Sequence, residues 1–328
     1  MKNFFACLLL FTTFTLSAQE KTEIPKKKFT FGGSLDAYYR TNFTAPNDDN
    51  QIAPATSFAD TAGFSLGMAN IIASYEKGKI GGVADLVFGP RGEAASATVI
   101  NQLFAYYNIS ENTKLTIGKF NTFLGYEVIS PTGNFNYSTS YLFSNGPFSH
   151  TGLKADFTLS EDFSLMLGVF NQTDVTEFNP DGSYAVGAQL GYKSQFLNLL
   201  YDKAGLGFEI DYTGGFDASA DFYVGINAAF ADNEGEGFYG AAIYPQYSAT
   251  ESLTVGLRGE YFQTQSDLVS DDPSVFSVTL TGSYVIEEDL IIKPEFRFDS
   301  GSEDIFIDTD LMATKSLGSF VLAAIYKF

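Results

Sequence analysis

Hydrophobic and polar residues alternate with period two along almost the whole chain after Phe29. In the segment 253–261, for example, Leu, Val, Leu, Gly and Tyr alternate with Thr, Gly, Arg and Glu, and the segment 290–298 shows a similar alternation. Such alternation is typical of a β-strand with one apolar and one polar face. The apolar faces are about 9–11 residues long, which is the length of a tilted strand that crosses a bilayer.

The connections between these strands alternate in length. Short polar turns are expected at 76–79, 110–113, 160–162, 194–195, 217–220, 250–252 and 287–289. Longer acidic or glycine-rich loops are expected at 44–60, 89–98, 127–149, 173–182, 232–237 and 265–274, with 202–205 as the shortest of this set. An outer-membrane barrel has short turns at one rim and long loops at the other, whereas a soluble sandwich has no reason to sort its loops in this way.

The number of strands follows from a parity argument. The pattern gives about 17 runs, but both termini of a bacterial barrel lie on the same side, so the number should be even. The doubtful run is 305–313, and we assign 301–317 mainly to a long last loop. We therefore predict an all-β fold, a transmembrane antiparallel up-and-down β-barrel of about 16 strands, with 14 or 18 as the alternatives.

The two ends of the chain carry export and assembly signals. Residues 1–18 combine Lys2, an apolar stretch and Leu16-Ser-Ala18 before Gln19, which is typical of a cleaved secretory signal. We expect 19–28 to form a periplasmic lead-in and 29–328 to form the barrel. The alternating C-terminal residues resemble the signal that the barrel-assembly machinery reads on outer-membrane proteins; they are Phe320, Leu322, Tyr326 and Phe328.

Composition narrows the function classes. The formal charge of −20 disfavours nucleic acid as a partner, because nucleic-acid binding depends on clustered Lys and Arg. The single Cys lies inside the signal segment, so disulfide frameworks and Cys-based zinc sites are excluded from the mature chain, and no cofactor is expected. Tyrosines near strand ends are expected in interfacial girdles; examples are Tyr38, Tyr39, Tyr106, Tyr107, Tyr261 and Tyr284.

Several short motifs lie in the central stretch 115–174. They are Gly118-Lys-Phe120, Gly125-Tyr-Glu127, Asn134-Phe-Asn136-Tyr-Ser138, Pro147-Phe-Ser-His150-Thr-Gly152 and Gly168-Val-Phe-Asn171. This stretch resembles the OmpL-like “putative β-barrel porin-2” family of Gram-negative outer membranes, and the opening Gly33-Ser-Leu-Asp36 and the terminal Phe are similar to the family's ends. The resemblance implies a barrel porin and supplies no solute and no catalytic residue. One departure is that 168–173 lacks the expected Asn-Gly.

The polar faces of the strands provide candidate pore-lining residues. They are Asp36, Arg40, Lys154, Asp156, Lys193, Glu209, Asp211, Arg258, Glu260, Lys293, Glu295 and Arg297, with Asp299 on the same faces. Because these charges nearly balance, the acidic composition does not by itself predict a cation-selective pore. Charges two residues apart, such as Arg258 and Glu260, can pair on one face. Structural ion pairing and a selectivity filter are the two interpretations.

The segment 127–149 is the longest connection in the first half and is unusually aromatic. Because loops of this length are commonly functional, we expect it to fold into the barrel and narrow it. A flap on the surface is the alternative. The candidate constriction residues are Glu127, Asn134, Asn136, Tyr137 and Ser138.

These observations predict a porin that passes small hydrophilic solutes or ions passively. The alternative is a closed barrel whose acidic loops bind a partner or surface. The expected partners are outer-membrane lipids and lipopolysaccharide, the barrel-assembly machinery, small solutes and further copies of the chain as a homo-oligomer.

Two kinds of chemistry are disfavoured. A barrel enzyme would depend on the single imidazole, His150, with Ser149 or Ser138 as nucleophile, but no local signature supports it, so we predict no enzyme activity. The acidic segments 47–50, 267–272 and 303–310 could hold Ca²⁺ or Mg²⁺, but none has the spacing of a calcium loop, and no specific metal site is predicted.

Overall fold

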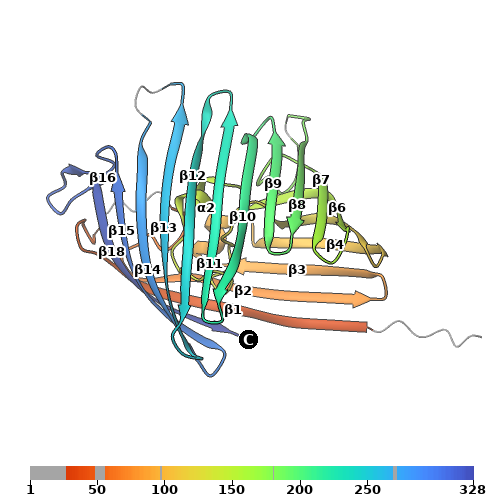
Figure 1. Ribbon diagram of the computed structural model, residues 1–328, viewed down its shortest axis with the longest axis horizontal. Coiled ribbons are helices and arrows are strands. Elements are labelled where there is room, and N and C mark those ends of the chain that lie inside the picture. Colours follow the sequence, from red (N-terminus) through yellow and green to blue (C-terminus); the bar gives the residue numbers. More distant parts are fainter. Residues whose placement is uncertain (1–26, 49–55, 97, 180, 269–271) are drawn as a thin grey trace, which may run out of the picture.

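The computed structural model describes residues 27–328 except 49–55, 97, 180 and 269–271. The expected signal peptide, 1–18, lies outside the described residues. Sixteen antiparallel strands close into one barrel, in which each strand pairs with its neighbours in sequence and the first pairs with the last (Figure 1). The predicted fold class and strand number are confirmed. Strand β1 begins at Lys27, two residues before the expected start of the barrel.

The barrel strands are β1 (Lys27–Asn42), β2 (Gly63–Lys77), β3 (Ile80–Phe88), β4 (Ile100–Ser110), β5 (Thr113–Asn121), β6 (Ser149–Thr158), β7 (Phe163–Phe170), β8 (Ala185–Tyr192), β9 (Gln195–Asp202), β10 (Gly207–Ser219), β11 (Phe222–Asn233), β12 (Glu236–Ser248), β13 (Leu253–Ser266), β14 (Ser274–Ile286), β15 (Leu290–Gly301) and β18 (Ser316–Lys327). Two short helices, α1 (Pro90–Ala95) and α2 (Tyr141–Asn145), lie in connections. No helix among the described residues is long and apolar enough to cross a membrane.

The doubtful run near residue 305 does not enter the barrel. It forms a small hairpin of β16 (Phe306–Ile307) and β17 (Ala313–Thr314), a separate two-stranded sheet within the last loop. The charged residues in this run interrupt the period-two pattern, which is why it cannot supply a membrane-facing strand. The sequence-based assignment of 301–317 mainly to a loop is therefore correct for 302–315, whereas Gly301 ends β15 and 316–317 begin β18.

Barrel closure depends on the two chain ends. Strand β1 pairs with β18 over nine residue pairs, from Ser34 opposite Lys327 to Asn42 opposite Ser319. Beyond them, Gly33 N–H donates to the Phe328 carbonyl and Phe328 N–H donates to the Gly33 carbonyl, each at 3.0 Å. Because an unpaired backbone group in hydrocarbon costs several kcal/mol, this seam removes the two edges that an open sheet would expose.

Side chains alternate between the two faces of the wall, as the sequence pattern predicts. On β13, Val255 and Leu257 are exposed on the outside, whereas Arg258 and Glu260 are fully buried inside. Outward residues are mostly apolar, and inward residues are mostly polar or small. An outer-membrane barrel has this arrangement.

The expected aromatic girdle holds only in part. Tyr107, Tyr261 and Tyr284 are exposed, as expected. Tyr38 is buried inside the barrel against the ring of Tyr137, and Tyr106 is paired with the buried Thr116 and shares its inward face. The girdle prediction is wrong for these two tyrosines, because neighbouring residues of a strand point to opposite faces.

The connections at one rim of the barrel are short turns. We number the connections at the other rim in chain order: L1 (43–62), L2 (89–99), L3 (122–148), L4 (171–184), L5 (203–206), L6 (234–235), L7 (267–273) and L8 (302–315). L6 contradicts the expectation of a long loop at 232–237. It is a two-residue turn in which Glu234 and Gly235 have positive φ angles of 57° and 92°. Turns of this kind match the twist of a hairpin, so loop length does not separate the two rims completely.

Deleting Phe328 should impair barrel closure, because both backbone hydrogen bonds to Gly33 are lost at about 1 kcal/mol each. We expect a lower folded yield and a lower Tm, measured by heat-dependent electrophoretic mobility after refolding into detergent. Phe328→Ala keeps both backbone hydrogen bonds, so its folded yield and Tm should fall less. An equal decrease of Tm in the two variants would show that the phenyl ring of Phe328, rather than the backbone hydrogen bonds, stabilises barrel closure.

Candidate functional site

L3 folds into the interior of the barrel. Its segment 136–143 is almost entirely buried, and α2 contacts the inner faces of β12 and β13. In Figure 1 the yellow-green segment that leads to α2 lies behind β10–β12, enclosed by the strands. Because the backbone of this segment is buried, its N–H and C=O groups need hydrogen-bond partners, and side chains of the inner wall supply them.

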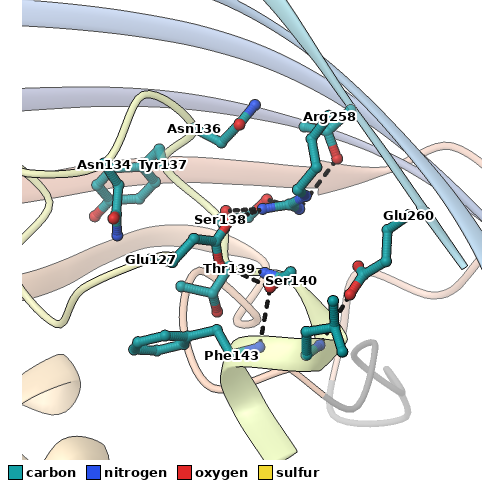
Figure 2. A network of polar contacts seen from close by, with 12 residues as sticks. Glu127, Asn134, Asn136, Tyr137, Ser138, Thr139, Ser140, Phe143, Arg258 and Glu260 are labelled. Carbon is teal, nitrogen blue, oxygen red and sulfur yellow. Dashed lines mark hydrogen bonds and ion pairs between the residues drawn. The ribbon is translucent and has the colours of Figure 1, made fainter. Parts of the chain in front are cut away.

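Arg258 on β13 is the centre of one network between the wall and L3 (Figure 2). Its guanidinium donates to Glu127 Oε1 at 2.8 Å and to the Ser138 carbonyl at 2.7 Å. Glu127 in turn accepts a hydrogen bond from the Ser140 backbone N–H at 2.7 Å. The ion pair therefore joins the two arms of L3 to each other and to the wall.

Two wall carboxylates accept from backbone N–H groups of L3. Glu260 accepts from Tyr141 at 3.1 Å and from Leu142 at 2.8 Å, beside the start of α2. Glu295 accepts from Tyr137 at 2.8 Å and from Ser138 at 3.1 Å, and also from the Ser138 hydroxyl. Hydrogen bonds to a charged acceptor are about twice as strong as neutral ones. These carboxylates therefore fix the middle of the loop.

Basic side chains pair with the carbonyls of the same loop. Lys293 donates to the carbonyls of Pro131, at 3.1 Å, and Asn134. Arg297 donates to the Thr139 carbonyl at 2.8 Å and forms an ion pair with Asp299 at 2.9 Å. The wall thus supplies acceptors for the N–H groups of L3 and donors for its C=O groups.

Aromatic and small residues complete the contact. The hydroxyl of Tyr137 donates to Asp36 on β1. Burial raises the pKa of the Tyr137 phenol above its usual range. Glycines on the wall make room for larger loop residues: a Cβ on Gly225 would lie 2.4 Å from the Tyr126 hydroxyl, and one on Gly240 would lie 3.2 Å from Leu142.

The end of L3 is held by L4. Asp174 accepts hydrogen bonds from the backbone N–H groups of Phe148 at 3.0 Å and Ser149 at 2.7 Å. Burial raises the pKa of the Asp174 carboxyl, while these hydrogen bonds and Lys119 act in the opposite direction. L3 is therefore anchored at its centre by the wall and at its end by a neighbouring loop.

The structure divides the candidate pore-lining residues into groups. One group lies beneath L3 and contacts it; it contains Asp36, Arg258, Glu260, Lys293, Glu295 and Arg297. All five candidate constriction residues are buried in L3; they are Glu127, Asn134, Asn136, Tyr137 and Ser138. Asn136 donates to Thr281 on β14 at 2.7 Å, and Asn134 bonds within the loop to Val128. The charges beneath L3 pair with the loop and do not face open space.

Three further candidates are buried elsewhere on the inner wall, and one of them, Asp211, also contacts L3. Arg40 donates to the Ala59 carbonyl of L1 at 2.7 Å. Asp211 accepts from Gly125 N–H at 3.0 Å and from two asparagine side chains of the wall, each at 2.6 Å. Glu209 is buried one inward position away on the same strand.

Lys154 and Asp156 on β6 form a different group, together with Lys114 on β5. Their side chains are 23%, 30% and 47% exposed, respectively. Asp156 lies 3.1 Å from the Lys154 ammonium and 4.0 Å from that of Lys114. L3 leaves this part of the inner wall uncovered.

Lys193 does not lie where the polar-face assignment puts it. It belongs to the turn between β8 and β9, with a φ angle of 53°, and is exposed at the short-turn rim. The assignment is wrong because the strand ends at Tyr192, so the alternation no longer fixes the side-chain direction.

His150 has a structural environment. It is fully buried between Phe123 and Phe170, with ring centroids 5.1 Å and 4.9 Å away, and its Nε2 lies 3.0 Å from the Thr122 hydroxyl. The two serines considered as nucleophiles bond elsewhere: Ser138 to Glu295, and Ser149 to Asp174. The described residues therefore assemble no serine–histidine dyad.

No three His, Cys, Asp or Glu side chains of the described residues are grouped closely enough to hold a metal ion. In L8, Asp308 accepts from the backbone N–H groups of Asp310 at 2.9 Å and Met312 at 3.0 Å, which stabilises the local turn. Parts of the other two acidic segments, 49–50 and 269–271, lie outside the described residues.

Two residues that contact or border this site were not candidates from the sequence. Lys114 alternates with Leu115 and Ile117, so the period-two pattern does mark it as inward. Arg91 lies in L2, donates to the Tyr137 carbonyl at 2.8 Å and lies 4.4 Å from the ring centre of Phe58. No periodic pattern covers L2, and nothing in the sequence marks Arg91.

A closed barrel with an apolar exterior, a charged interior and a long loop folded inside defines an outer-membrane porin. The chain belongs to the family described as “putative beta-barrel porin-2, OmpL-like”, whose profile matches residues 28–328. The resemblance seen in the sequence is thereby confirmed. Family and fold place the protein in the outer membrane of a Gram-negative bacterium.

Several solved structures share the fold. The outer membrane channel DcaP of Acinetobacter baumannii has a TM-score of 0.66 and 13% identity over 92% of this chain and 97% of that one. An anion-selective porin from Comamonas acidovorans has a TM-score of 0.64 and 10% identity over 92% and 100%. The trimer form of OmpT of Vibrio cholerae has a TM-score of 0.58 and 12% identity over 92% and 99%. None of the curated proteins compared with the chain matches it.

Glu260→Gln should loosen the middle of L3, because it replaces a charged acceptor of two backbone N–H groups by a neutral one. We expect the amides of Tyr141 and Leu142 to exchange with solvent on the order of tenfold faster. Hydrogen exchange followed by mass spectrometry would measure this. Glu111→Gln, in an exposed turn, is the control. Unchanged exchange in Glu260→Gln would show that other contacts hold the loop.

Proposed function

We propose that the protein is a porin through which small hydrophilic solutes and ions diffuse passively. The observation that carries the proposal is the partial coverage of the inner wall: L3 covers the wall around β13–β15 and β1 and leaves Lys114, Lys154 and Asp156 partly exposed. Barrels of about 16 strands are wide enough to hold an aqueous channel. L3 is then the element that narrows this channel.

The uncovered charges suit a hydrated pathway. Partly exposed ion pairs contribute little to stability, typically less than about 1 kcal/mol, because water competes for both partners. The pairs that Asp156 makes with Lys114 and Lys154 can therefore exchange with a passing ion or polar solute at low cost. The fully buried pair of Arg258 and Glu127 has no such exposure and holds the loop in place.

Export and assembly belong to the same proposal. Cleavage after Ala18 would release the mature chain into the periplasm. Leu322, Tyr326 and Phe328 are exposed on the outside of β18 and at the chain end, where assembly machinery could contact them. A homo-oligomer is compatible with the fold, since OmpT of Vibrio cholerae has a trimer form.

The alternative is a closed barrel that binds a partner through its loops. It is favoured by the complete burial of the wall charges beneath L3. The two functions differ in one property, the presence of an open aqueous path.

Single-channel conductance of the purified protein in a planar bilayer distinguishes the open porin from the closed barrel. We expect discrete, stable current steps, and deleting 134–148 should enlarge them because it removes the middle of L3. Shortening L8 between 303 and 313 is the control, since this hairpin lies at the rim. No steps from protein shown to be folded would contradict the porin function and support the closed barrel.

Lys114→Glu should shift ion selectivity toward cations, because it reverses a charge that is 47% exposed in the uncovered region. The reversal potential under a KCl gradient would measure the shift. Lys203→Glu changes the net charge equally but lies in L5, at the rim, and should leave the potential unchanged. A similar shift in both variants would mean that Lys114 is not beside the ion path.

A further inference from the structure

The outer face of β1–β4 carries an apolar groove of about 500 Å³. The register defines its shape: Phe29 pairs with Tyr75, Tyr75 with Gly82, and Ala73 with Ala84. The outward positions along its middle are therefore small, whereas Phe29, Tyr75, Ile80 and Leu103 rise around them and are exposed. The result is a shallow groove in the lipid-facing surface.

Lysines gather at one end of this groove. Lys77 lines it, and Lys27 pairs with Lys77 across β1 and β2. Lys79 lies in the turn that follows, where its ammonium donates to the Ile109 carbonyl at 3.1 Å. All three are exposed, and Lys28 adds a fourth positive charge on the opposite face of β1. The chain has only 19 Lys and Arg against 39 Asp and Glu, so this concentration of positive charge runs against its composition.

The position of the lysines identifies the leaflet. They lie at the rim that carries the short turns, which in an outer-membrane barrel faces the periplasm. The periplasmic leaflet of the outer membrane consists of glycerophospholipids, whereas lipopolysaccharide occupies the other leaflet. A headgroup at this rim is therefore a phospholipid headgroup.

We propose that this groove is a binding site for an anionic phospholipid of the periplasmic leaflet. An acyl chain lies over Ala73, Gly82 and Ala84, and the phosphate lies between Lys27 and Lys77. Burial of the acyl chain against the apolar walls supplies affinity for any phospholipid. The lysines supply preference for a net negative headgroup, since a basic residue near a membrane surface attracts anionic lipid.

Native mass spectrometry of the full-length mature protein in detergent tests the site. Palmitoyl-oleoyl phosphatidylglycerol and phosphatidylethanolamine with the same acyl chains are the two probes. We expect tighter retention of phosphatidylglycerol. Lys77→Gln should weaken its binding about fivefold and leave phosphatidylethanolamine unaffected. Ala84→Phe should weaken both lipids, because it fills the groove.

Lys193→Gln is the matched control, because Lys193 is an exposed lysine on the same rim at the turn between β8 and β9. It should leave the retention of both lipids unchanged. An equal effect of Lys77→Gln and Lys193→Gln would overturn the site in favour of general charge attraction. Isolation of an oligomer that retains no lipid would also overturn it, because a second copy would then cover the groove. Heat-dependent mobility shows that each variant is folded.

Discussion

The structure depends on one constraint, which is that every backbone N–H and C=O away from water has to find a partner. The strands meet it by closing into a ring, with Gly33 and Phe328 completing the seam. L3 has no such regular partner, since it is an irregular segment inside the ring. Its backbone is satisfied by charged side chains of the wall, which take the place that water or a neighbouring strand would otherwise have.

This constraint explains why so many charges lie inside the barrel. Glu260 and Glu295 accept from loop N–H groups, and Arg258, Lys293 and Arg297 donate to loop carbonyls. Removing one partner of such a buried set leaves an uncompensated charge, which is costly. The same charges therefore hold L3 against one side of the inner wall.

Different strands of the barrel wall make different contacts. Around β13–β15 the wall binds L3, at β5 and β6 it carries partly exposed charges on its inner face, and the outer face of β1–β4 carries an apolar groove with lysines at its end. A period-two strand can serve two faces at once because successive side chains point in opposite directions. One sheet can thus hold a loop on its inner face and carry an apolar groove on its outer face without further domains.

The sequence by itself predicted the barrel, about 16 strands and most of the residues that face inward, since alternation is a local property that each strand shows on its own. It also indicated that an aromatic segment would enter the lumen. Only the tertiary structure decided that Arg258 lies beneath L3 while Lys154 is partly exposed, and that Arg91 contacts the loop. Arg258 and Glu127 are 131 positions apart, and no local pattern encodes a contact over that separation. The side-chain directions of Lys193 and Tyr38 could not be predicted from local pattern for the same reason. For Lys193 the deciding factor is where its strand ends, and for Tyr38 it is what packs against the inner face, and both depend on distant parts of the chain.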